Sequence, residues 1–169
     1  MQSLKAPPYI RPAEPDDALA IARLFYDTVH HVNCRDYSPE QLAAWAPERD
    51  AEERFRLRQQ RLVTFVAVAE EKIIGFAELH VAQDTADANP GRIDCFYVHK
   101  DAQRLGAGTL LMRRLKISAS LRKIPELSAE VSITAKPFFE RHDFETVQQQ
   151  TVFRENVAFT NFLMKSALS

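Results

Sequence analysis

The chain has 169 residues, 46% of them apolar, and a formal net charge of −1; this length suits one domain with its own core, and the charge gives no field that would draw the protein to nucleic acid or a membrane surface. Its two cysteines provide neither a disulfide framework nor the spacing of a zinc site, residues 1–8 lack the apolar core of a signal peptide, and no apolar run approaches the ~20 residues of a membrane helix. We therefore expect one domain over residues 1–169 in the reducing cytoplasm, with no bound metal and no nucleic-acid or membrane partner.

The N-terminal part predicts a short strand and a helix. Residues 9–11 are strand-like, and Pro15 suits the first position of a helix whose apolar residues recur at helical spacing as far as Val29. His30 and His31 follow where this helix should end. They either bind its last carbonyl groups or line a ligand pocket.

A second helix is predicted from Ser38, with Pro39 at its first position and Gln41 completing a capping box. Trp45 on this helix either packs in the core or stacks on a ligand. Residues 49–61 contain five arginines mixed with acidic residues and few aromatic residues. This mixture favours a solvated helix face over a patch that binds nucleic acid.

The remaining pattern predicts a sheet. Residues 62–69 are almost continuously apolar, typical of a strand covered on both faces, and residues 73–81 alternate, so the two should form an antiparallel hairpin. After a polar loop come the other expected elements: a strand at 93–98, a helix at 109–123, a strand at 126–133, a short helix at 134–142, and a strand pair at 146–153 and 157–164. The predicted fold class is α/β, with a mixed, largely antiparallel central sheet flanked by helices.

The most informative stretch joins the strand at 93–98 to the next helix. Two of the four glycines in the chain, Gly106 and Gly108, lie one residue apart here. Unpaired N–H groups at a helix start attract an anionic phosphate, and glycine lets the ligand approach the backbone. A Walker A loop would need a lysine before Thr109, and the dinucleotide fingerprint would need a third glycine at Leu111. The stretch therefore predicts either a phosphate-binding turn of another type or a plain turn.

The segment Gln103-Arg104-Leu105-Gly106-Ala107-Gly108 resembles the Gln/Arg-x-x-Gly-x-Gly/Ala loop of the GNAT superfamily of acetyl-CoA-dependent N-acetyltransferases. Ile10-Arg11-Pro12-Ala13 is similar to the first strand of that family, Ile73-Ile74-Gly75-Phe76-Ala77 to its third, and residues 137–144 to its late helix and turn. The resemblance implies a GNAT-like fold and transfer of an acetyl group from acetyl-CoA to a primary amine of a small molecule or a peptide, by direct attack in a ternary complex. The sequence neither predicts nor excludes that the protein forms a homodimer.

In this family the loop holds the pyrophosphate of coenzyme A, and the strand before it pairs with the pantetheine arm, which a splayed sheet admits. Asp143 replaces a family glycine and tolerates a left-handed backbone better than most residues. By resemblance, the residues expected to bind the cofactor are Phe96, Tyr97, Val98, Gln103, Arg104, Leu105, Gly106, Ala107, Gly108, Thr109, Phe138 and Phe139.

Acetyl transfer to an amine needs a base and a proton donor. Glu78, a carboxylate within an apolar strand, is the first candidate for the base unless its face is solvent-exposed; Asp94 is the second, unless it caps a strand end. The family places a tyrosine acid where this chain has Phe139, which has no proton to give. Tyr97, Tyr26 or water must then protonate the departing thiolate. The alternative is a non-catalytic acyl-CoA-binding module.

Overall fold

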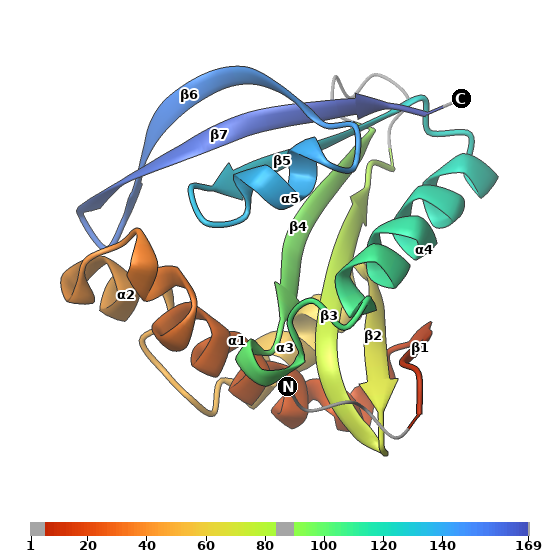
Figure 1. Cartoon of the computed structure of the whole chain (residues 1–169), viewed down its shortest axis with the longest axis horizontal. Helices are drawn as coiled ribbons and strands as arrows, with labels where there is room; N and C mark the ends of the chain where they lie inside the picture. Colours follow the sequence, from red (N-terminus) through yellow and green to blue (C-terminus); the bar gives the residue numbers. More distant parts are fainter. Residues whose placement is uncertain (1–5, 84–89, 169) are drawn as a thin grey trace.

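Seven strands form one sheet in the computed structural model, which describes residues 6–83 and 90–168 (Figure 1). The strands are β1 (Tyr9–Pro12), β2 (Val63–Ala69), β3 (Lys72–Val81), β4 (Gly91–Val98), β5 (Glu126–Ser132), β6 (Glu145–Arg154) and β7 (Val157–Ala167). Their order is β1-β2-β3-β4-β5-β7-β6, and only the β4–β5 pair is parallel. The predicted mixed, largely antiparallel sheet is confirmed.

The helices lie on both faces of this sheet. They are α1 (Ala18–His31), α2 (Pro39–Trp45), α3 (Glu52–Gln59), α4 (Ala107–Leu121) and α5 (Lys136–Glu140), with short 3-10 turns η1 (Pro15–Asp17), η2 (Asn33–Arg35) and η3 (Lys100–Ala102). The predicted capping box at the start of α2 is present, since Ser38 Oγ accepts from Gln41 N at 3.2 Å and Gln41 Oε1 accepts from Ser38 N at 2.8 Å. The polar loop predicted at 83–91 falls largely outside the described residues. Within the described segments, no helix is both long and apolar enough to span a membrane.

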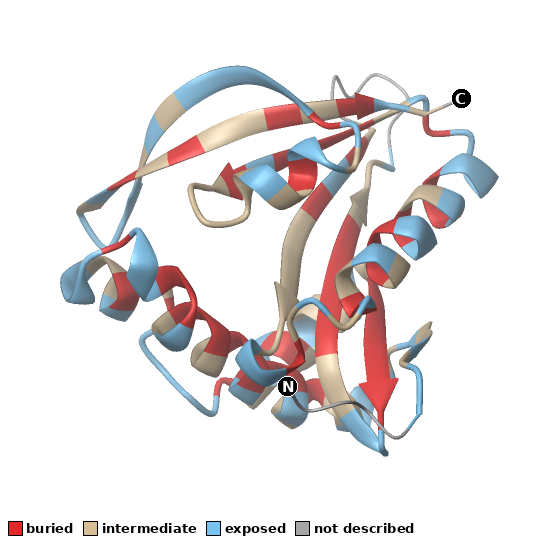
Figure 2. Cartoon of the chain, in the orientation of Figure 1, coloured by how far each residue is buried: buried red, intermediate tan, exposed pale blue. Residues whose placement is uncertain are grey.

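The sheet separates two hydrophobic clusters because neighbouring residues of β3 point to opposite faces. Ala77 and Leu79 pack with Leu111 of α4, whereas Phe76 packs with Phe25 of α1 and Phe55 of α3. Figure 2 shows the resulting buried surfaces of β2 and β3 and the exposed outer strand β6. The hairpin that holds both clusters confirms the prediction for residues 62–81.

The sheet opens between β4 and β5. These strands pair only at Arg92 with Ser128 and at Ile93 with Ala129, and they diverge beyond that point (Figure 1). The pairing of β4 with β3 also shifts where the strands separate: Glu78 lies opposite Cys95 and Leu79 opposite Ile93, which leaves Asp94 as an extra, bulged residue. The splayed sheet that the resemblance implied is present.

Tyr37 connects α2 to the far part of the sheet. Its hydroxyl donates to Thr160 O on β7 at 2.7 Å and accepts from Ile133 N at the end of β5 at 3.0 Å. Gln41 Nε2 also donates to Ala158 O on β7 at 2.8 Å. These bonds hold α2, and with it Trp45, beside the opening of the sheet.

Candidate functional site

Two cavities meet at the opening between β4 and β5. The first, which we call the loop cavity, has a volume of about 520 Å³ and extends between β4, β5, α5 and the turn before α4. The second, the arginine cavity, has a volume of about 590 Å³ and extends between α1, α3, β4, β5 and the end of β6. The residues that line both cavities, which we call the junction, are Trp45, Asp94, Cys95, Tyr97, Ala129 and Glu130.

Two glycines lie at the turn into α4. Gly106 has φ +87°, and a Cβ at this position would meet nothing within 4 Å, so the left-handed backbone rather than space requires glycine. A Cβ on Gly108 would lie 3.1 Å from the ring of Phe138, a tight contact that this ring on α5 would have to relieve by shifting. The first intrahelical bond runs from Leu110 N to Gly106 O at 3.1 Å. The amides before Leu110 therefore have no carbonyl partner within α4.

Most residues expected to bind the cofactor line one cavity. Leu105 does not line it, and Ala107 is 1% exposed and packs in the core. The expected residues that line the loop cavity are Phe96, Tyr97, Val98, Gln103, Arg104, Gly106, Gly108, Thr109, Phe138 and Phe139.

Phe139 is a wall of the loop cavity and part of the core. It is 3% exposed, and its ring centroid lies 5.7 Å from that of Phe96 and 5.0 Å from that of Phe144. Asp143 has φ 67°, as expected for a residue in place of a turn glycine. Phe139 thus places an aromatic ring with no dissociable proton where the resemblance implied a tyrosine.

The strand β4 presents an unpaired backbone edge to the loop cavity. Phe96, Tyr97 and Val98 pair with β3, opposite Ala77, Phe76 and Gly75 respectively. Along its other edge, β4 pairs with β5 only as far as Ile93. An extended ligand can therefore add to β4 as a strand would.

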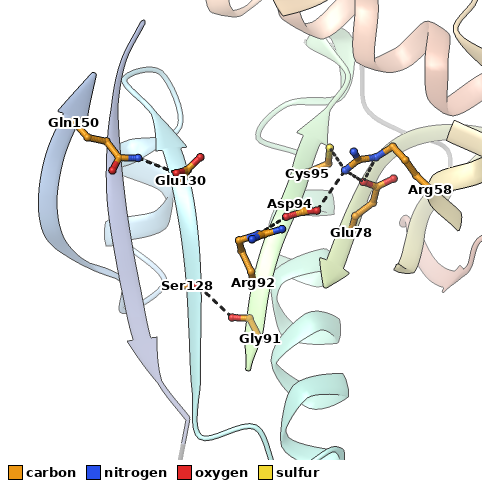
Figure 3. A network of polar contacts seen from close by, with 9 residues as sticks. All are labelled: Arg58, Glu78, Gly91, Arg92, Asp94, Cys95, Ser128, Glu130 and Gln150. Carbon is orange, nitrogen blue, oxygen red and sulfur yellow. Dashed lines mark hydrogen bonds and ion pairs between the residues drawn. The ribbon is translucent and has the colours of Figure 1, made fainter. Parts of the chain in front are cut away.

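Glu78 lies beneath the site rather than in it. Its side chain is 0% exposed and lines neither cavity, and its Oε2 accepts from Arg58 Nε at 2.8 Å and from Arg58 Nη2 at 2.6 Å (Figure 3). Burial by itself lowers the pKa of Arg58, but Cys95, Glu78 and Asp94 outweigh it and hold that pKa above its ordinary value. Glu78 thus anchors a charged guanidinium that reaches the arginine cavity from α3.

Asp94 occupies the junction because of the bulge in β4. Its carboxylate is 18% exposed; Oδ1 accepts from Arg92 Nε at 2.6 Å, and Oδ2 lies 3.7 Å from Arg58 Nη2 (Figure 3). Across the opening, Gln150 Nε2 on β6 donates to Glu130 Oε1 on β5 at 3.0 Å. Two carboxylates therefore line the place where the cavities meet.

Tyr97 brings a phenol to the same place. Its ring lies 5.1 Å from Phe25, edge to face, and 5.6 Å from Phe76, stacked. Burial raises the pKa of Tyr97 above its ordinary value, so the phenol keeps its proton at neutral pH. Burial likewise raises the pKa of the Cys95 thiol, which makes this residue a neutral side chain rather than a nucleophile.

Other candidates lie away from the junction. Tyr26 lines neither cavity, and its ring lies 4.2 Å from that of His30. His31 Nδ1 donates to Asp27 O at 2.8 Å, four residues earlier in α1, and His30 Nε2 lies 2.9 Å from Ala46 O. The two histidines line neither cavity; His31 binds a carbonyl of its own helix as the helix-end interpretation predicted, whereas His30 contacts the carbonyl at the end of α2.

Several site residues escaped the sequence analysis. The interpretation of residues 49–61 as a solvated face holds for Arg54, which is exposed although it lines the arginine cavity with Arg154, and it is wrong for Arg58, which is partly buried and paired with Glu78. Trp45 lines both cavities and also contacts the ring of Phe159 in the core, so both of its predicted roles are filled. The density of arginines in 49–61 was a signal, but the sequence did not show which of them turn inward.

Known proteins resemble the chain over almost its whole length. The family profile described as acetyltransferase (GNAT) domain matches residues 33–166. The uncharacterized N-acetyltransferase YafP of Escherichia coli K12 is 33% identical over 156 residues, which are 92% of this chain and 93% of that protein.

Solved structures share its fold. A GCN5-related N-acetyltransferase from Rhodopseudomonas palustris matches with a TM-score of 0.85 and 29% identity, covering 99% of each chain. The PaiA N-acetyltransferase of Thermoplasma acidophilum, solved in complex with coenzyme A, matches with a TM-score of 0.78 and 18% identity, covering 96% of this chain and 99% of that one.

Proposed function

The chain belongs to the GNAT family of acetyltransferases, and on that premise we propose that it transfers the acetyl group of acetyl-CoA to a primary amine by direct attack within a ternary complex. The observation that carries this proposal is the meeting of two cavities at one junction. Because each cavity has its own walls, two ligands can be held at once with their reactive ends together.

The loop cavity suits coenzyme A. The free amides before Leu110 lie at the positive end of α4 and would bind the pyrophosphate, to which Leu105 and Ala107 contribute only backbone groups. The open edge of β4 at Phe96 and Val98 would pair with the pantetheine arm. A Thermoplasma protein of the same fold was solved in complex with coenzyme A, which supports coenzyme A as the ligand of this chain.

The arginine cavity would hold the acceptor, and junction residues would move the protons. A C–N bond forms as the C–S bond of the thioester breaks; the amine loses a proton and the thiolate gains one. We assign the acceptance of the amine proton to Asp94, because Asp94 reaches both cavities whereas the fully buried Glu78 reaches neither. Glu78 takes the role of positioning Arg58.

Tyr97 would supply the proton to the thiolate. Its hydroxyl is the alternative to the missing family tyrosine at Phe139, and it lies at the junction that both ligands would reach. A thiolate is a good leaving group, so this step needs only modest assistance.

Steady-state kinetics test the proposal. We expect coenzyme A to be released from acetyl-CoA only when an amine is added, and initial velocities measured against both substrates to give intersecting reciprocal plots. Parallel plots would contradict direct attack. Binding of acetyl-CoA with no release across a broad panel of amines would instead indicate the non-catalytic module.

A further inference from the structure

The arginine cavity is lined by both acidic and basic side chains. Its acidic side chains, Asp94 and Glu130, are at the junction and also line the loop cavity. The four arginines that line it, Arg54, Arg58, Arg92 and Arg154, line only the arginine cavity. Negative charge therefore lies next to the site of transfer, where Asp94 contacts Arg58 and Arg92 but forms no ion pair with Arg54 or Arg154.

Two of these arginines are already paired with carboxylates. Arg58 binds Glu78 with both Nε and Nη2, and Arg92 Nε donates to Asp94 Oδ1 at 2.6 Å. These pairs are internal to the site and leave little net charge for a ligand.

Arg54 and Arg154 differ in that neither forms an ion pair within residues 6–83 and 90–168. The guanidinium of Arg54 lies 5.3 Å from the ring centroid of Phe55, and that of Arg154 lies 5.8 Å from the ring centroid of Trp45. Contact with an aromatic ring orients a guanidinium and leaves its N–H groups able to bind a carboxylate with two hydrogen bonds.

Apolar and aromatic side chains form part of the walls of the arginine cavity. Phe25, Phe55, Trp45 and Leu163 line the arginine cavity. From this arrangement we infer that the acceptor is an amine that also carries a carboxylate on an apolar or aromatic body, with its ammonium group beside Asp94 and Glu130 and its carboxylate toward Arg54 and Arg154. The inference rests on the proposed function, because it takes the arginine cavity as the acceptor site.

Trp45 permits a test that does not depend on turnover. It is the only tryptophan of the chain and lines the cavity, so its fluorescence reports a ligand there. The probes are two pairs in which a carboxamide replaces the carboxylate: 4-(aminomethyl)benzoate with 4-(aminomethyl)benzamide, and phenylalanine with phenylalaninamide, compared at a pH low enough that the amine of phenylalaninamide is also protonated. Titrations are made with coenzyme A present and no acetyl donor.

We expect the carboxylate of at least one pair to bind about 10-fold more tightly than its amide. Arg54→Gln and Arg154→Gln should each reduce this ratio of dissociation constants toward one. Arg61→Gln is the matched control, because Arg61 is exposed and lines neither cavity. The ratio is taken within each variant, so a changed environment of Trp45 does not affect it.

Amides that bind as tightly as their carboxylates in both pairs would overturn the inference, as would a preference that survives in both cavity variants. No response to either carboxylate up to about 10 mM would overturn it too. The test of the proposed function is separate. If the carboxylate and the amide of a pair both cause release of coenzyme A from acetyl-CoA to the same extent, the proposed function stands and the inference of a carboxylate site fails. If the carboxylates bind more tightly than their amides but no amine causes release of coenzyme A, the carboxylate site stands and the proposed function fails.

Discussion

At the scale of single residues, the site depends on one extra residue in β4. Without the bulge, Asp94 would pair with β3 and the alternation of the strand would place it elsewhere. The bulge instead holds its carboxylate between Arg92 and Arg58, at the edge of both cavities. Glu78, one strand away, has the same chemical group and no access to either cavity.

Substitution separates the roles of these two carboxylates. Asp94→Asn should lower kcat about 10²–10⁴-fold, because it removes the proton acceptor, and should leave the binding of acetyl-CoA unchanged. Glu78→Gln should lower the free energy of unfolding by about 1–3 kcal/mol, because it weakens the hold on Arg58, and should raise the KM for the acceptor more than it lowers kcat.

Steady-state kinetics over pH and urea unfolding measure these effects. The assignment would be reversed if Glu78→Gln abolished the acidic limb of the kcat profile at normal stability while Asp94→Asn kept it. Glu78 would then be the base, as the sequence first indicated.

At the scale of elements, the turn into α4 needs glycine at position 106, where the backbone is left-handed. Gly106→Ala should cost about 1 kcal/mol of stability, because its left-handed φ of +87° disfavours a Cβ that would otherwise meet no atom. We expect it to weaken the binding of acetyl-CoA, because it shifts the amides before Leu110. The affinity of the carboxylate probes for the arginine cavity should not change.

Calorimetric titration with acetyl-CoA and the fluorescence of Trp45 measure the two affinities separately. Equal losses of both would show that the substitution disturbs the fold as a whole rather than the turn. An unchanged affinity for acetyl-CoA would place the pyrophosphate elsewhere.

The link between β1 and α1 makes stability depend on pH. Arg11 donates to both carboxylate oxygens of Asp17, at 2.7 and 3.0 Å, and this hydrogen bonding lowers the pKa of Asp17. A carboxyl group with a lowered folded-state pKa stabilises the fold above its unfolded pKa of about 3.9, and the contribution is lost as pH falls through the folded value.

Asp17→Asn should therefore lower the free energy of unfolding by about 1 kcal/mol at neutral pH, and the difference from wild type should shrink in acid. Asp16→Asn is the control, because Asp16 lies in the same turn and is exposed. Urea unfolding across pH measures both variants. A difference that stays constant down to acid pH would mean that the Asp17 charge is not the cause.

Local patterns account for the elements that could be predicted from the sequence. The capping box of α2, the glycine turn before α4 and the hairpin of β2 and β3 depend on neighbours a few residues apart, and each is present. The arginine cavity could not be predicted in this way, because Arg58 meets Glu78 20 positions later and Arg154 meets Trp45 from the far end of the chain. Such contacts follow from tertiary packing.

At the scale of the whole molecule, the site exists because the sheet is divided. β1 to β4 form one part and β5 to β7 the other, joined along β4–β5 at only two residue pairs. Tyr37 and Gln41 brace β7 from α2 with hydrogen bonds of 2.7 and 2.8 Å to carbonyl groups. Each hydrophobic cluster contains residues of both parts, so packing on the two faces holds the parts together beside the opening.

The thermal shift with acetyl-CoA, with free adenosine as control, tests this account most directly. At about 100 times its dissociation constant, a ligand that binds only the folded chain stabilises it by about 2.7 kcal/mol. For a protein of this size the account predicts that acetyl-CoA raises Tm by roughly 5–10 °C and that adenosine does not. No shift at saturating acetyl-CoA would contradict it, and the glycine turn and the opening between β4 and β5 would then have no ligand to explain them.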